Sequence, residues 1–99
     1  MRVPRIRPDR DHVYHLYVIR TGKRDALKKH LADAGIATVL NYPKALPFYP
    51  AYRYLGHVPQ DFPVAFSNQS RILSLPIYPE LSDAQAQYVA DRIRDFYRG

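Results

Sequence analysis

Residues 12–40 read HVYHLYVIRTGKRDALKKHLADAGIATVL, which is the pattern of a strand, a helix and a second strand joined by short turns. Residues 12–19 are rich in β-branched and aromatic side chains, which favour strands. The side chains that alternate along this segment are largely apolar on both sides. This pattern is typical of a central strand that is covered on both faces.

A helix is predicted next, because apolar side chains recur at helical spacing between Ala26 and Ala34 while charged side chains occupy the opposite side. Gly35 stands where a residue with a left-handed backbone commonly ends a helix. Residues 36–40, IATVL, then predict the second strand.

The remainder of the chain predicts further helices and a third strand. Residues 50–56 predict a helical turn, residues 61–71 a helix and residues 72–76 a short strand. A final helix is expected to begin after Ser82, because Gln85 follows at the spacing of a capping box. Its expected buried stripe consists of six side chains, namely Ala86, Val89, Ala90, Ile93, Phe96 and Tyr97.

These elements predict an α+β fold with a short antiparallel three-stranded sheet packed with helices. Residues 1–11 lack periodicity and are expected to form an extended lead-in, so that residues 12–99 make up one domain. A small sheet with helices on one face leaves its other face open, although the expected strands are apolar on both sides. We therefore expect the domain to pack on another domain or another chain.

The composition narrows the classes of function. Cysteine is absent, which excludes disulfides, thiolate zinc sites and cysteine catalysis and is compatible with the cytoplasmic location that we expect. No apolar run approaches the ~20 residues that span a membrane, and no hydrophobic segment follows the first arginines as a secretory signal requires. The net charge of +6 indicates either a solvated helix face and tail, which we favour, or a nucleic-acid partner, for which no motif is present.

Residues with catalytic chemistry are scattered along the chain. The four histidines lack metal-ligand spacing and are expected to be structural, and the carboxylates form no acid–base pair. Neither a G-x-S-x-G elbow nor a phosphate-binding glycine loop is present. From the residues alone, we expect no self-sufficient active site and no catalytic, cofactor-binding or metal-binding residue.

A binding role is best supported for residues 41–54, NYPKALPFYPAYRY, which combine three prolines, four tyrosines and a phenylalanine. Prolines lower the entropy that a loop loses on binding, and tyrosine offers a stacking face and a hydroxyl. Asn41 adds a donor and an acceptor. The loop either contacts a polar, ring-shaped ligand such as a sugar or nucleotide, or covers the open apolar face of the domain.

Four blocks of sequence together resemble the carboxy-terminal portion of the DegT/DnrJ/EryC1/StrS aminotransferases. They are HLYVIR, R-x-x-L-x-x-x-L-x-x-x-GI, NYP and LSLPIYPEL, in the order and spacing of that family. The family comprises pyridoxal-phosphate (PLP)-dependent enzymes that aminate nucleotide-linked keto-sugars. The resemblance implies the small domain of a type I aminotransferase, which packs on a large PLP-binding domain in a dimer.

The same resemblance implies substrate-binding roles for four residues of the NYP loop: Asn41, Tyr42, Lys44 and Phe48. Many relatives carry histidine at the position of Asn41, so we expect hydrogen bonding there but no proton transfer. The family's catalytic lysine, the aspartate that pairs with the pyridine nitrogen and the phosphate cup have no counterpart in this sequence. The chain is therefore not expected to bind PLP or to transaminate by itself.

Two functions are consistent with these features. The first is a carboxy-terminal domain or fragment of a PLP-dependent sugar aminotransferase, inactive alone. The alternative is a stand-alone module that pairs with a full-length aminotransferase or binds nucleotide-sugars.

Overall fold

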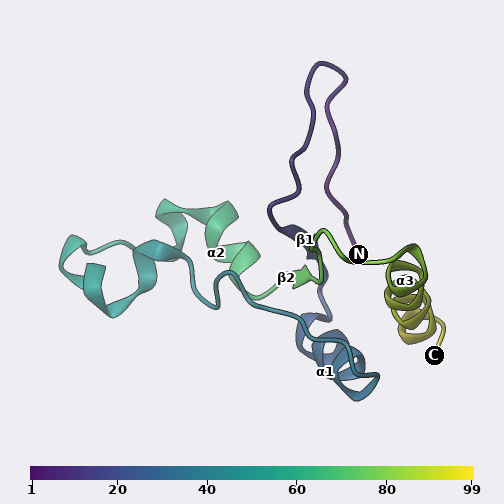
Figure 1. Ribbon diagram of the computed structural model, residues 1–99. Coiled ribbons are helices and arrows are strands. Elements are labelled where there is room, and N and C mark those ends of the chain that lie inside the picture. Colours follow the sequence, from purple (N-terminus) through teal and green to yellow (C-terminus); the bar gives the residue numbers. More distant parts are fainter.

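A computed structural model describes residues 1–99 and shows a small antiparallel sheet with three α-helices around it (Figure 1). Strand β1 is Tyr17–Arg20 and β2 is Ile72–Leu75, with Tyr17 opposite Leu75 and Arg20 opposite Ile72. The helices are α1 (Arg24–Asp33), α2 (Pro63–Gln69) and α3 (Asp83–Arg98). Figure 1 shows α2, with the turns that precede it, reaching away from the sheet on the side opposite α3.

The mixture of helices and antiparallel strands is confirmed, but the three-stranded sheet is wrong, because only β1 and β2 form a ladder. The expected strand at residues 36–40 makes one isolated bridge to β2. In this bridge Val39 and Ser74 exchange two backbone hydrogen bonds, of 3.1 and 2.9 Å.

The ladder beyond this bridge is blocked at both ends. Antiparallel partners have residue numbers with a constant sum, so the next hydrogen-bonded pairs would be Ala37 with Pro76 and Asn41 with Ile72. Pro76 has no backbone N–H to donate. The Ile72 carbonyl instead accepts a hydrogen bond from Arg24 Nη1 at 3.1 Å. Residues 36–40 therefore run alongside β2 without joining the sheet as a strand.

The first strand is shorter than residues 12–19, since only its last residues pair with β2. Tyr14 has φ 53°, in the left-handed region, which interrupts an extended chain. On the other edge of β1, Arg2 and Arg20 exchange backbone hydrogen bonds of 2.7 and 3.0 Å. The lead-in is thus attached to the sheet near its start and loops outward before β1 begins (Figure 1).

The hydrophobic core lies between α1, the sheet and α3. Its six buried side chains are Ile19, Leu27, Leu31, Ile36, Leu73 and Ile93. Gly35 ends α1 with φ +80°, as expected. Polar contacts also join the elements: the Tyr97 and Thr21 hydroxyls are hydrogen-bonded, and Tyr88 Oη donates to the Ala34 carbonyl at 2.8 Å.

The start of α3 is confirmed in detail. Gln85 N donates to Ser82 Oγ at 3.1 Å, and Ser82 N donates to Gln85 Oε1 at 2.9 Å, which completes the capping box. The expected stripe is only partly buried, with Ile93 in the core and Ala86 and Ala90 exposed. None of the helices is both long and apolar enough to cross a bilayer.

Replacing Ser82 with alanine is expected to destabilise the fold by about 1 kcal/mol, because the amide of Gln85 would lose its acceptor. Urea unfolding followed by circular dichroism measures this change. Ser70→Ala is the matched control, because Ser70 is exposed after α2 and its hydroxyl forms no hydrogen bond within the chain. Equal midpoints for the two variants would contradict a stabilising role for the cap.

The uncovered part of α3 borders an apolar groove of about 520 Å³. Tyr17 and Ile19 of β1, Leu75 of β2 and Val89 of α3 line it, and Val3 of the lead-in forms part of its wall. The groove is a candidate contact site, since exposed apolar surfaces commonly mark contacts with other proteins or ligands.

Candidate functional site

The candidate site lies in the lobe that follows the Val39 bridge. Three short 3-10 helices lead into α2: η1 (Leu46–Phe48), η2 (Pro50–Leu55) and η3 (Pro59–Asp61). Prolines stand in the first turns of all of them and of α2, where the missing N–H costs no hydrogen bond.

The turn predicted at residues 50–56 is confirmed and ends at Gly56 with φ +68°. The helix predicted at residues 61–71 is confirmed, with narrower bounds.

The NYP loop and α2 enclose a hollow of about 510 Å³. Three of the four predicted site residues, Asn41, Tyr42 and Lys44, line it together. The hollow is open to solvent, since Tyr42 is 60% exposed and Leu46 is 62% exposed. Its floor and walls include apolar side chains, among them Phe62 of the α2 cap.

The orientation of Asn41 is set by β2. Ser74 Oγ, which is buried, donates to Asn41 Oδ1 at 2.7 Å. The amide oxygen is therefore occupied, while the amide nitrogen has no hydrogen-bond partner in the chain. Asn41 consequently presents donors at the edge of the hollow, consistent with the hydrogen-bonding role expected from the sequence.

Helix α2 contributes two amides that were not among the predicted site residues. Asn68 Oδ1 accepts from Arg20 Nη1 at 3.3 Å, which leaves its amide nitrogen unpaired on the same hollow. Gln69 Oε1 accepts from Ala45 N at 3.0 Å and so holds the NYP loop against α2. The only sequence signal for these residues is a pair of adjacent amides at the end of an expected helix, which does not by itself indicate a site.

Phe48 is separated from the other three predicted residues. Its ring packs edge-on against Phe66, with centroids 5.6 Å apart, and it lines a second hollow of about 160 Å³. The prediction for Phe48 as a contact of the same ligand therefore requires a ligand that extends beyond the larger hollow.

The larger hollow combines hydrogen-bond donors with apolar walls. The donors are the amide nitrogens of Asn41 and Asn68, the Tyr42 hydroxyl and the Lys44 ammonium group. Lys44 forms no ion pair or hydrogen bond within the chain, so its charge is free. This arrangement suits a ligand rich in oxygen acceptors that also has apolar ring faces, such as a sugar.

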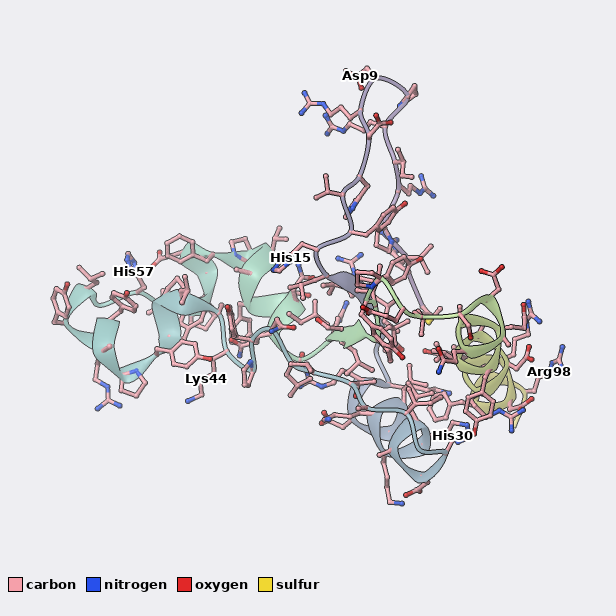
Figure 2. All side chains as sticks on the ribbon, in the orientation of Figure 1. Asp9, His15, His30, Lys44, His57 and Arg98 are labelled. Atoms are coloured by element: carbon pink, nitrogen blue, oxygen red, sulfur yellow. The ribbon has the colours of Figure 1, made fainter.

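The histidines and carboxylates of the chain form no cluster that could hold a metal ion. No group of three or more His, Asp and Glu side chains comes together. Figure 2 shows His15, His30 and His57 on separate parts of the fold. The hydrogen bond that Lys29 Nζ donates to Asp33 Oδ2, 2.7 Å away, raises the pKa of the exposed Lys29, and the Coulombic attraction of the two groups adds to this.

Known proteins are similar to this chain in sequence and fold. The sequence profile of the DegT/DnrJ/EryC1/StrS aminotransferase family matches residues 1–94. A dTDP-3-amino-3,4,6-trideoxy-alpha-D-glucose transaminase of Streptomyces venezuelae is 41% identical over 96 residues, which are 95% of this chain and 25% of that protein. A pleiotropic regulatory protein of Geobacillus stearothermophilus is 44% identical over 89 residues, which are 90% of this chain and 24% of that protein.

Solved structures agree with these sequence matches. The structure of DesV from S. venezuelae superimposes with a TM-score of 0.90 at 39% identity, over 95% of this chain and 25% of that chain. A DegT DnrJ EryC1 StrS aminotransferase from Brucella abortus gives a TM-score of 0.87 at 37% identity over the same shares. The chain thus spans about a quarter of the length of the relatives that it matches. With most of its residues inside the family match, the chain belongs to the DegT/DnrJ/EryC1/StrS aminotransferase family.

Proposed function

We propose that this chain is the carboxy-terminal domain, or a fragment containing it, of a PLP-dependent aminotransferase that acts on nucleotide-linked keto-sugars. Within that unit, residues 12–99 form the domain and the larger hollow contacts the sugar. The observation that carries this proposal is the convergence of Asn41, Tyr42 and Lys44 on one hollow with apolar walls. The family match and the S. venezuelae relative support a nucleotide-linked sugar as the ligand.

The residues present do not fit a PLP site, because none of the four lysines has the surroundings that a cofactor-binding lysine needs. Such a lysine is activated by burial or by a neighbouring cation, which lowers its pKa. Lys29 has the opposite shift, Lys28 Nζ lies 3.5 Å from Thr38 Oγ1, and Lys23 lies over the Tyr97 ring. Lys44 stands on the open rim of the larger hollow. We infer that the cofactor and its lysine belong to the rest of the enzyme.

The apolar groove beside α3 supports a partner for this domain. Most of its lining is hydrophobic, and the relatives have about three-quarters of their length outside the matched region. We assign the groove to the large PLP-binding domain, in agreement with the expectation that the domain packs on another. The assembled enzyme is expected to be a dimer in the cytoplasm.

A chimeric enzyme tests the sugar-contact role. Residues 1–99 replace the matching quarter of the S. venezuelae transaminase, and sugar amination is measured by chromatography of the nucleotide-sugar product. In this chimera Asn41→Asp is expected to lower kcat/KM by about 10- to 100-fold. The aspartate retains an acceptor for Ser74 Oγ but removes the amide donor.

Gln60→Glu is the matched control, because it makes the same change of amide to carboxylate at an exposed side chain that forms no hydrogen bond within the chain and lines neither hollow. This variant is expected to keep the activity of the chimera. The cofactor absorbance of each variant shows that it is assembled. A fully assembled Asn41→Asp chimera with unchanged kcat/KM would refute the role of the larger hollow in sugar binding.

A further inference from the structure

A smaller hollow of about 160 Å³ lies on the same lobe as the larger one. It is lined by Pro47, Phe48, Tyr49, Arg53 and His57. Its volume is below the roughly 300 Å³ at which pockets for whole small molecules begin. It is therefore suited to one polar group of a ligand whose remainder lies elsewhere.

The two hollows are adjoining parts of one surface. Pro47 lines both of them. Phe62, which lines the larger hollow, packs edge-on against the His57 ring of the smaller one, with ring centroids 4.9 Å apart. A ligand seated against Phe62 can thus extend past Pro47 into the smaller hollow.

The smaller hollow has a free positive charge. Residues 41–70 contain two permanent cations, Lys44 on the larger hollow and Arg53 on the smaller one. Arg53 forms no ion pair and no side-chain hydrogen bond within the chain, so its guanidinium donors are all available.

His57 lines the same hollow as Arg53 and lies near a carboxylate. Asp61 Oδ2 lies 3.6 Å from His57 Nδ1 and also accepts from Val58 N at 2.9 Å, which partly satisfies the carboxylate. The other ring nitrogen, Nε2, has no partner in the chain. The Asp61 carboxylate favours a proton on Nδ1, and in the imidazolium form, where both ring nitrogens carry protons, Nε2 is a donor for the hollow.

We propose that the smaller hollow binds the diphosphate of a nucleotide-linked sugar, through the Arg53 guanidinium with a further donor from His57. This inference rests on the proposed function, since it places the sugar of the same ligand in the larger hollow. A guanidinium matches phosphate geometry through paired, charge-assisted hydrogen bonds, which a lone ammonium cannot reproduce. The proposal also explains why Phe48 lies away from Asn41, Tyr42 and Lys44.

Titration of the ¹⁵N-labelled chain by NMR tests this site without requiring catalysis. The probes are dTDP, inorganic pyrophosphate and thymidine. We expect dTDP and pyrophosphate to shift the Arg53 side-chain Nε–H signal and the backbone amides of Tyr49 and His57, and thymidine to leave them unchanged. Arg53→Gln is expected to weaken dTDP binding by about tenfold or more.

Arg98→Gln is the matched control, because Arg98 is exposed and Figure 2 shows it at the opposite end of the molecule from His57. It removes the same charge and is expected to leave dTDP affinity unchanged. His57→Gln is expected to weaken binding less than Arg53→Gln. Equal losses in the Arg53→Gln and Arg98→Gln variants, or no shift with dTDP and pyrophosphate, would overturn the proposal.

The two proposals can fail separately. Asn41→Asp is expected to weaken dTDP binding less than Arg53→Gln does, because dTDP lacks the hexose that the larger hollow is proposed to contact. If Arg53→Gln weakens dTDP binding while the chimera retains full activity with Asn41→Asp, the diphosphate site stands and the sugar site is wrong. The reverse pair of results would leave the sugar site and remove the diphosphate site.

Discussion

Leu73→Ala is expected to lower the free energy of unfolding by about 2–5 kcal/mol. Leu73 is fully buried in β2 and belongs to the cluster that joins the sheet to α1 and α3. Only 9 of 99 residues are buried, so few other contacts can compensate for the cavity. Because small domains have margins of about 5 kcal/mol or little more, a loss at the upper end of this range is expected to leave a large unfolded fraction at 25 °C.

Chemical denaturation followed by tyrosine fluorescence and circular dichroism measures this loss. Leu55→Ala makes the same truncation on η2, where the side chain is 51% exposed, and is expected to change stability by less than about 1 kcal/mol. Similar destabilisation by both substitutions would show that Leu73 is not part of a cooperative core.

Local signals in the sequence were reliable where the structure depends on neighbouring residues. The capping box needs only Ser82 and Gln85, three positions apart, and both of its hydrogen bonds are present. Gly35 likewise ends α1 through its own backbone conformation. Such features involve no partner from elsewhere in the chain, so spacing and residue type were sufficient to predict them.

The strands were predicted less well, because a strand requires a partner at the right register. The third strand is excluded by Pro76 and by the hydrogen bond from Arg24 to the Ile72 carbonyl. Pro76 lies more than 30 positions from Val39, and Arg24 lies on another element, α1. The β-branched pattern of residues 36–40 therefore could not indicate either of them. Non-local pairing, not propensity, decided how many strands the sheet has.

The candidate site was predictable to the extent that it is local. Asn41, Tyr42 and Lys44 lie within four positions of one another, and the structure keeps them on one hollow. Asn68 and Gln69 reach this hollow only because α2 packs against the NYP loop, which no periodicity indicates. The residues of the site that lie far from the NYP loop in the sequence could therefore be identified only from the fold.

The uncovered apolar groove beside α3 accounts for the incomplete burial of the expected stripe. Val89 is half-buried while Ala86 and Ala90 are exposed, although all three line the groove. The periodicity of α3 correctly marks an apolar face, but burial of that face requires a surface that these 99 residues do not supply. Under the proposed function, this face of α3 contacts the rest of the enzyme.

Arg24→Met is expected to destabilise the fold by about 2–3 kcal/mol and also to disturb the larger hollow. Arg24 is 8% exposed, and its Nη1 donates to the carbonyls of Gln69 and Ile72 at 3.2 and 3.1 Å. Methionine retains much of the apolar volume but leaves both carbonyls without this donor. Because Gln69 also binds Ala45 N through its side chain, movement at the end of α2 is transmitted to the NYP loop.

Two measurements separate the structural and functional parts of this effect. Denaturation of the 99-residue chain gives the loss of stability, and kcat/KM of the assembled chimera gives the effect on the hollow. Arg24→Lys is expected to be intermediate, since an ammonium group keeps the charge but cannot reproduce the planar guanidinium, whose Nε also donates to Asp25 Oδ1 at 2.6 Å.

The control is Arg98→Met, on the exposed end of α3, which should change neither the stability nor kcat/KM. If Arg24→Met matches Arg98→Met in both measurements, Arg24 does not connect α1 to the binding lobe. An effect on stability alone would confine Arg24 to the core and leave the hollow supported by Gln69 and Ser74.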